Sequence, residues 1–286
     1  MTGPGRRVAR ALGFLALLAL GACTAIERAT LPPAAITDPG WQAFTAGSSR
    51  AVDHTAWDRF LAAYLRADGE GIGRVDYAAV TPDDHAALKA YIATLGREDV
   101  AALDRPAQLA YWINLYNAVT VDLVLDAYPV TSIRRVGAGL LPTGPWGAPV
   151  VMVRGKALSL NDIEHAIVRP IWQDARVHYG FNCAAAGCPN LAAVAYRGAT
   201  VDALLQQNAR AFVNDPRGFR DEDGRLVASK IYAWFKEDFG GTDAGVLAHA
   251  RRFAGPALAA RLEGATGIDR YDYDWSLNDT TACAAC

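Results

Sequence analysis

The sequence lacks the excess of basic residues that nucleic-acid-binding proteins usually carry. Lysine and arginine together number 28 against 30 acidic residues, which gives a formal net charge of -2. We therefore expect no nucleic-acid partner. The chain also has no internal repeat of about 20–50 residues, which argues against solenoid and propeller architectures.

The signatures of several common catalytic machineries are missing as well. The chain has no Walker loop, no Gly-x-Ser-x-Gly elbow and no dinucleotide-binding fingerprint. Nucleotide-driven chemistry and serine hydrolysis of that type therefore have no support, and we expect no cofactor. Hydrophobic residues make up 52% of the 286 residues and charged residues 20%, which is ordinary for a packed globular protein.

The first 22 residues resemble the signal peptide of a bacterial lipoprotein. Arg6, Arg7 and Arg10 precede an apolar run that is too short to span a bilayer. The run ends in Leu20-Gly21-Ala22-Cys23, which resembles a lipobox. We expect cleavage before Cys23, a lipid on its sulfur that makes the membrane a partner, and an outer-membrane location facing the periplasm. The alternative is an ordinary cleaved signal followed by a chance cysteine.

The rest of the chain divides into three parts. Residues 23–50 are rich in proline, glycine and serine, which predicts a flexible stalk after the lipidated cysteine. Residues 51–278 carry helix and strand patterns, so we expect a single globular domain there. Residues 279–286 form a tail that contains Cys283 and Cys286.

Helical patterns dominate the domain. The segment from Asp104 to about Tyr128 is apolar on most sides, which predicts a buried central helix. Short hairpins are expected at 150–158 and at 219–227, and Ser159 and Asp162 have capping-box spacing at the start of another helix. The predicted fold is α+β: a mostly helical domain around a central helix, with a small and mainly antiparallel sheet.

The residues with the most reactive chemistry cluster around two cysteines. Cys183 or Cys188 as nucleophile, His178 as base and Glu164 as the group that orients the base would form a thiol enzyme. We choose Cys183 as nucleophile because it directly follows residues 176–181, which we expect to be a strand. His178 and Cys183 are five apart, so a loop must turn the cysteine back towards the histidine.

Amide side chains supply candidate binding groups for the same site. Asn114 and Asn117 share a face of the predicted central helix, and Asn182 precedes Cys183. The first functional hypothesis is therefore a thiol-dependent hydrolase or transferase that acts on an envelope peptide or a small substrate, whose identity the sequence leaves open.

The same cysteines have a less specialised explanation. An oxidising compartment favours a disulfide between Cys183 and Cys188, whose four-residue loop is able to close. The second hypothesis is therefore a non-enzymatic envelope binding or scaffold module in which this disulfide is structural and His178 is a satisfied core histidine. A metal site is not expected, because the spacing of His178, Cys183 and Cys188 is not that of a standard zinc site.

Several separated motifs resemble the domain of unknown function 547 family. They are Tyr111-Trp112-Ile113-Asn114-Leu115-Tyr116-Asn117-Ala118, Leu158-Ser159-Leu160-Asn161-Asp162-Ile163-Glu164-His165, Arg176-Val177-His178-Tyr179-Gly180, Gly187-Cys188-Pro189 and Tyr273-Asp274-Trp275-Ser276-Leu277-Asn278. The similarity extends over roughly residues 70–278 and implies one domain, but it brings no established activity. The Cys283 and Cys286 tail departs from the family pattern.

Overall fold

The structure is a computed structural model that describes residues 28, 31–69, 71–137 and 144–281. The predicted signal peptide, Cys23 and the pair Cys283 and Cys286 lie outside these residues. Within them, no helix is both long enough and apolar enough to cross a membrane.

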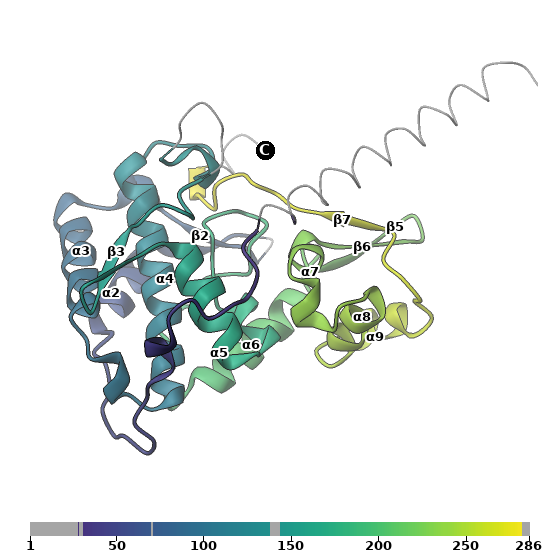
Figure 1. Ribbon diagram of the computed structural model, residues 1–286. Coiled ribbons are helices and arrows are strands. Elements are labelled where there is room, and N and C mark those ends of the chain that lie inside the picture. Colours follow the sequence, from purple (N-terminus) through teal and green to yellow (C-terminus); the bar gives the residue numbers. More distant parts are fainter. Residues whose placement is uncertain (1–27, 29–30, 70, 138–143, 282–286) are drawn as a thin grey trace, which may run out of the picture.

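The described chain is mainly helical, with short strands in separate small sheets (Figure 1), which confirms the predicted α+β fold. The α-helices are α2 (Thr55–Tyr64), α3 (Pro82–Gly96), α4 (Arg105–Ala127), α5 (Arg169–Trp172), α6 (Val201–Val213), α7 (Lys230–Trp234), α8 (Asp243–Arg251) and α9 (Pro256–Glu263). The 3-10 helices are η1 (Pro39–Gln42), η2 (Tyr77–Ala79), η3 (Val100–Ala102), η4 (Ile133–Arg135), η6 (Ala175–Tyr179) and η7 (Lys236–Phe239), and η5 (Asp162–Val168) is a π-helix.

The strands form three sheets. They are β1 (Leu65–Ala67), β2 (Gly73–Val75), β3 (Val151–Val153), β4 (Lys156–Leu158), β5 (Phe219–Glu222), β6 (Arg225–Ser229) and β7 (Arg270–Asp272). The pairs β1–β2, β3–β4 and β5–β6 are antiparallel, whereas β7 adds to β6 in parallel. Both predicted hairpins are present, and Arg154-Gly155 and Asp223-Gly224 form their turns with the positive φ angles that such tight turns need.

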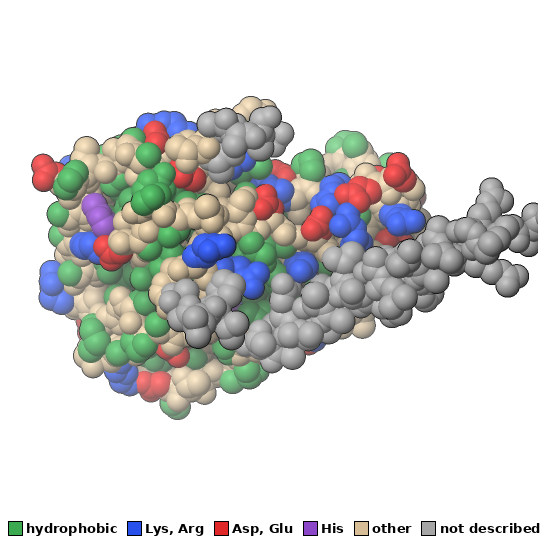
Figure 2. All heavy atoms as spheres, turned by 90° about the horizontal axis from the view of Figure 1, so that it is seen from above, with side chains coloured by type: hydrophobic (Ala, Val, Ile, Leu, Met, Phe, Trp, Pro, Cys, Tyr) green, Lys and Arg blue, Asp and Glu red, His purple; other side chains and the backbone are tan. Residues whose placement is uncertain are grey.

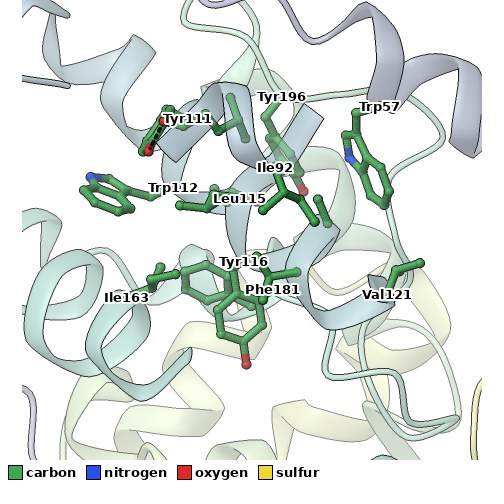
Figure 3. Packing of buried hydrophobic residues seen from close by; sticks show 14 of the residues in the cluster. Trp57, Ile92, Tyr111, Trp112, Leu115, Tyr116, Val121, Ile163, Phe181 and Tyr196 are labelled. Carbon is green, nitrogen blue, oxygen red and sulfur yellow. Dashed lines mark hydrogen bonds between the residues drawn. The ribbon is translucent and has the colours of Figure 1, made fainter. Parts of the chain in front are cut away.

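Helix α4 is the buried centre of the larger part of the molecule (Figure 3). The Asp104 carboxylate accepts the Ala107 N–H at 2.9 Å, and proline follows in the first turn, so the helix begins where the sequence predicts. Its side chains are buried on all sides from Gln108 to Val121, including Tyr111 and Trp112, which are fully inaccessible. The helix therefore organises the main hydrophobic core.

A second hydrophobic cluster is formed by side chains of the β5–β6–β7 sheet and of helices α7, α8 and α9, which pack together. The two clusters meet at Trp275, which packs against both. After β7 the chain crosses from the smaller part to the larger one (yellow in Figure 1), where Leu277 pairs with Ala185 and Asp279 with Val75. The C-terminal segment therefore ties the two clusters together.

Two local predictions need correction. Residues 176–181 do not form a strand: residues 175–179 are the 3-10 helix η6, so strand alternation does not decide where His178 points. The described part of the predicted stalk is docked on the domain, because Ala35 donates its N–H to the His165 carbonyl at 3.0 Å and Trp41 is only 6% exposed. The Trp41 ring lies edge-on to Trp112 at 5.5 Å, which draws this segment into the core.

The surface carries charges of both signs (Figure 2). Over the smaller part, Arg220 and Arg270 both pair with Glu222 and with Asp272. Positive and negative side chains therefore neutralise one another at these four positions of the sheet.

Because the N-terminal segment is docked on the domain, we expect substitutions of Trp41 and Phe44 to change the free energy of unfolding by unequal amounts. Trp41→Ala removes a buried ring from the core and should lower the free energy of unfolding by about 3 kcal/mol. Phe44→Ala is the matched control, because Phe44 is 45% exposed and contacts Arg105 at the surface, and it should change stability by less than about 1 kcal/mol. Denaturant unfolding measures both, and equal small effects would show that the segment is undocked in solution.

Candidate functional site

The candidate site lies where the two hydrophobic clusters meet. It is assembled from η5, η6 and η7, the 182–190 loop and the C-terminal segment that follows β7. Segments that are far apart in sequence therefore supply its polar groups.

Glu164 enters the site from the π-helix η5. Ser159 and Asp162 form the predicted capping box, with the Ser159 N–H donating to Asp162 at 2.8 Å and the Asp162 N–H donating to Ser159 Oγ at 3.1 Å. The wider π-helical turn holds both Glu164 and His165 in the interior, at 8% and 3% exposure. Such turns are rare and are found frequently at functional sites.

His178 lies between two carboxylates. Its Nε2 is 2.7 Å from Oδ2 of Asp238, and its Nδ1 is 3.7 Å from Oε1 of Glu164. The ring stacks on Phe235, with centroids 4.3 Å apart. The structure thus brings Glu164 and His178 together, as the thiol-enzyme hypothesis requires, and adds Asp238 as a partner that the hypothesis did not include.

Arg169 completes a buried charge network behind His178. Its guanidinium holds Asp238 through two hydrogen bonds, at 2.6 and 3.1 Å. Burial alone raises the pKa of Asp238, but the hydrogen bonds from His178 and Arg169 outweigh it and hold that pKa well below its usual range. Arg169 also lies 3.0 Å from Nδ1 of His165, and because a guanidinium can only donate, this nitrogen is an acceptor.

Burial lowers the pKa of His165, and the positive charge of Arg169 acts in the same direction against the opposing pull of Glu164. His165 is therefore a neutral imidazole in this network.

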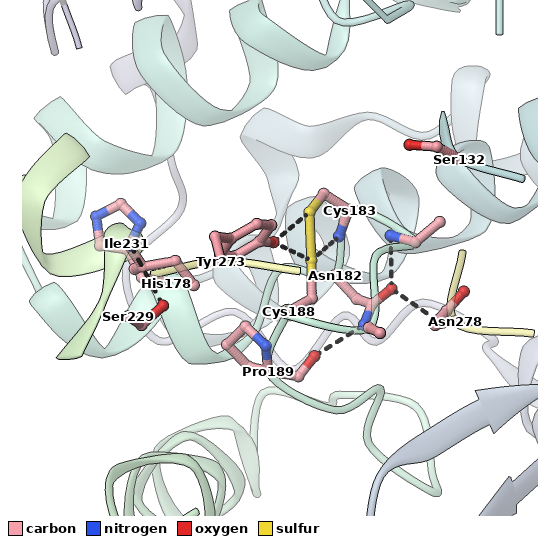
Figure 4. The surroundings of a disulfide bond; sticks show 12 residues. Ser132, His178, Asn182, Cys183, Cys188, Pro189, Ser229, Ile231, Tyr273 and Asn278 are labelled. Atoms are coloured by element: carbon pink, nitrogen blue, oxygen red, sulfur yellow. Dashed lines mark hydrogen bonds between the residues drawn. A yellow bond between two sulfur atoms is a disulfide. The ribbon is translucent and has the colours of Figure 1, made fainter. Parts of the chain in front are cut away.

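The two cysteines of the 182–190 loop are joined in a disulfide, with Cα atoms 6.3 Å apart (Figure 4). Cys188 is 3% exposed, whereas Cys183 is only partly buried. The Tyr273 hydroxyl lies 3.0 Å from both sulfur atoms, and the Cys183 N–H donates to the Cys188 sulfur at 3.0 Å. Among the described residues, His178 makes polar contacts with the two carboxylates and with neither sulfur. In the view of Figure 4, Tyr273 lies between His178 and the disulfide.

The loop is fixed by hydrogen bonds that do not involve the disulfide. Asn182 accepts the Ala184 N–H at 2.9 Å and donates to the Pro189 carbonyl at 2.8 Å. Arg217 donates to the Ala186 carbonyl at 3.0 Å and the Cys188 carbonyl at 2.9 Å. Asn182 therefore connects the start of the loop to its end, and Arg217 holds the middle of the loop to its end.

The C-terminal segment adds backbone hydrogen bonds to the same loop. Ala186 donates to the Ser276 carbonyl at 2.8 Å, and Gly187 donates to the Asp274 carbonyl at 2.9 Å. A Cβ at Gly187 would lie 2.8 Å from the Asp274 nitrogen, so glycine is required for this approach.

The predicted binding amides have structural partners. Asn114 donates to the Tyr196 carbonyl at 2.8 Å and accepts its N–H at 3.0 Å. Asn117 donates to the Gly180 carbonyl and accepts the Asn182 N–H, each at 2.9 Å. All three asparagines are at most 3% exposed, and their side chains bond backbone groups in the core. Their role in substrate binding stays a prediction.

Asp238 and Tyr273 were missed as site residues for different reasons. Asp238 follows Lys236 and Glu237 in a charged stretch that reads as a solvated helix face, and no sequence signal marks it as the partner of His178. Tyr273 opens the last of the motifs that resemble the 547 family, so its position was marked even though its contact with sulfur was not.

A separate cluster on α3 and α4 has the composition of a metal site. His85, Asp122 and Asp126 bring potential ligand atoms within 4.8 Å of one another. The Lys89 ammonium is 2.8 Å from each of the two carboxylates, so a cation from the chain itself already balances their charge. We therefore interpret this cluster as an ion-pair network between two helices.

The environment of Asp238 predicts that part of the unfolding free energy depends on pH in the acidic range. Because its pKa is lowered in the folded state, it stabilises the fold above the unfolded-state pKa of about 3.9, and this contribution is lost as pH falls below that value. Asp238→Asn should weaken the fold by about 3 kcal/mol at pH 7 and flatten the decline in stability below pH 5. The exposed carboxylate of Asp202 provides the control, and Asp202→Asn should keep the wild-type profile in urea unfolding from pH 7 to pH 2. An unchanged profile for Asp238→Asn would contradict the assignment.

Comparison with known proteins identifies one family. Residues 100–213 match the family described as "Protein of unknown function, DUF547". The matched range contains α4, Glu164, His178 and both cysteines of the loop, whereas Asp238 and Tyr273 lie beyond it. No curated protein and no solved structure matches the chain. Over residues 100–213, the chain is therefore similar to the DUF547 family.

Proposed function

We propose that this protein performs thiol–disulfide exchange at Cys183–Cys188, as a lipid-anchored protein of the cell envelope. The observation that carries the proposal is that the 182–190 loop is held by hydrogen bonds from Asn182, Arg217 and the C-terminal segment. A disulfide in a loop that is already fixed is available for chemistry without loss of the local structure.

The size of the loop supports this reasoning. Cys183 and Cys188 are five residues apart, and closing so small a loop stabilises a fold by only about 2 kcal/mol in the chain-entropy model. A bond that spans a long stretch of chain contributes more, roughly 4–5 kcal/mol for a 100-residue loop. If the disulfide is purely structural, it therefore adds little to the unfolding free energy, because other hydrogen bonds already hold the loop.

The unequal exposure of the two cysteines sets the direction of attack. Cys183 is the partly exposed member of the pair and Cys188 the buried one. A substrate thiolate therefore attacks the Cys183 sulfur, a new S–S bond forms to the substrate, and the Cys183–Cys188 bond breaks with its electron pair passing to Cys188. A second substrate thiolate then attacks the mixed disulfide, leaving an oxidised substrate disulfide and two reduced cysteines.

The surroundings of the loop suit a peptide substrate. A cavity of about 290 Å³ lies beside it, lined by Gly187, Arg217, Arg220, Asp272, Tyr273 and Asp274. These groups offer charges of both signs and an aromatic edge, which is compatible with a polar peptide thiol of the envelope. The oxidising compartment implied by the lipoprotein-like signal favours this chemistry.

The earlier assignment of Cys183 as a hydrolytic nucleophile needs a different state of the protein. Its sulfur must first be reduced, and a base must reach it, but the polar partners of His178 in the structure are Glu164 and Asp238. Exchange uses the disulfide that is present and requires no such base. Hydrolysis by a Cys183–His178–Glu164 triad remains a prediction for the reduced protein.

The proposal predicts that the pair reacts with glutathione and that the fold survives reduction. In redox buffers of glutathione, the unreduced full-length chain should equilibrate Cys183–Cys188 at a potential above about −300 mV, the range below which structural disulfides of secreted proteins lie. Site-resolved alkylation and mass spectrometry measure this ratio. The reduced protein should lose only about 2 kcal/mol of unfolding free energy.

Trapping variants test which sulfur is attacked. Cys188→Ser should accumulate a glutathione mixed disulfide on Cys183, whereas the matched variant Cys183→Ser should accumulate at least about ten times less on the buried Cys188, because access controls the rate. Resistance of the wild-type pair to glutathione, or unfolding of the domain on reduction, would refute exchange and show that the disulfide is structural, as the binding or scaffold hypothesis requires.

A further inference from the structure

We infer that Tyr273 is a catalytic residue of this exchange, because its hydroxyl and the Cys183 N–H form a two-donor site for the thiolate of Cys188 (Figure 4). The inference rests on the proposed exchange reaction, and it assigns a role to a residue outside the matched family range.

The geometry places both donors on the sulfur that leaves. The Tyr273 oxygen is 3.0 Å from the Cys183 sulfur and 3.0 Å from the Cys188 sulfur, and the Cys183 nitrogen is 3.0 Å from the Cys188 sulfur. A hydroxyl has one proton, so in the disulfide it is shared across the bond. Once the bond opens, the Cys188 sulfur carries the negative charge and becomes the stronger acceptor.

Packing holds the hydroxyl in place before the reaction begins. The Tyr273 ring contacts Trp234 and Trp275, with centroids 4.8 and 4.7 Å away. Its backbone N–H donates to Asp272 at 2.9 Å, and the next residue, Asp274, accepts the Gly187 N–H from the cysteine loop. The donor is therefore preorganised, and little reorganisation is needed when charge develops on sulfur.

The hydroxyl acts as a donor that keeps its proton. Burial raises the pKa of Tyr273, and the nearby Glu164 acts in the same direction against the opposing effect of Arg217. Tyr273 therefore stays neutral while the thiolate forms, and the stabilisation is a hydrogen bond from O–H to S⁻. The charge remains on Cys188 until a solvent proton or the return reaction removes it.

The step balances without a proton from Tyr273. The substrate thiolate supplies the electron pair of the new bond to Cys183, and the pair of the broken bond goes to Cys188. Stabilising this leaving thiolate speeds the attack, since a thiol of lower pKa leaves faster. It also favours the reduced protein, which makes the disulfide a stronger oxidant.

Tyr273→Phe tests the inference, because it removes the hydroxyl and keeps the ring. Tyr128→Phe is the matched control, since it deletes a hydroxyl that donates to Asp279 at 2.8 Å and touches neither sulfur. In the full-length chain, Tyr273→Phe should lower the equilibrium constant for oxidising glutathione about tenfold, which corresponds to a potential about 30 mV more negative. Tyr128→Phe should leave it unchanged.

The thiol pKa gives a readout that does not depend on exchange. In the Cys183→Ser variant, which keeps the backbone N–H, we expect the Cys188 thiol to titrate below the ordinary value of about 8.5, although burial alone would raise it. Adding Tyr273→Phe should raise this pKa by about one unit, a tenfold loss of thiolate. Site-resolved alkylation against pH measures both values.

The outcomes separate the two claims. Exchange that persists in Tyr273→Phe with an unchanged equilibrium constant and an unchanged Cys188 pKa would overturn the role of Tyr273 and leave the proposed function standing. A Cys188 pKa above 8.5 in Cys183→Ser would overturn the two-donor site even if Tyr273→Phe did not fold. A wild-type disulfide that is inert to glutathione would overturn the proposed function.

Discussion

Backbone hydrogen bonds between the cysteine loop and the C-terminal segment hold the candidate site together. Ala186 donates to Ser276, Gly187 donates to Asp274, and Asn278 donates back to Ala184. These bonds join segments about 90 residues apart and bring Tyr273 against the disulfide. Because the same segment continues from β7 into the larger core, the position of the sulfur atoms depends on how both hydrophobic clusters pack.

Charge in the site is arranged in two separate environments. The carboxylates, His178 and Arg169 form a closed network in which each charge has a partner at hydrogen-bond or ion-pair distance. The sulfur atoms contact a neutral hydroxyl and a backbone N–H. The charge network therefore has a structural role beside the disulfide. The hydroxyl and the N–H that contact sulfur are suited to stabilise a single negative charge.

The sequence alone was sufficient for the elements whose signals are local. The central helix, its Asp104 cap, the capping box at Ser159 and both hairpin turns depend on neighbouring residues, and the structure has them as predicted. It also indicated that Glu164 and His178 belong together. The contacts of Asp238 and Tyr273 depend on tertiary packing between distant segments, and local patterns carry no trace of such packing.

The errors have the same origin. Proline and glycine around Trp41 suggested a free stalk, but burial of one tryptophan against the central helix outweighs the low structural propensity of the segment. Residues 176–181 looked like a strand, but they pair with no strand in the part of the chain that the structure describes, and residues 175–179 form a 3-10 helix. The amides of Asn114 and Asn117 are occupied by buried backbone groups, at Tyr196 for Asn114 and at Gly180 and Asn182 for Asn117, and no sequence signal marked these contacts.

The central claim is that the cysteine loop keeps its structure whether or not the sulfur atoms are bonded. Amide hydrogen exchange in the oxidised and the reduced protein measures this directly at Ala186, Gly187 and Asn278, whose N–H groups make the hydrogen bonds described above. The account predicts that the protection of these amides is nearly the same in the two states. A loss of protection on reduction, while α4 stays protected, would show that the disulfide holds the loop and would contradict the account.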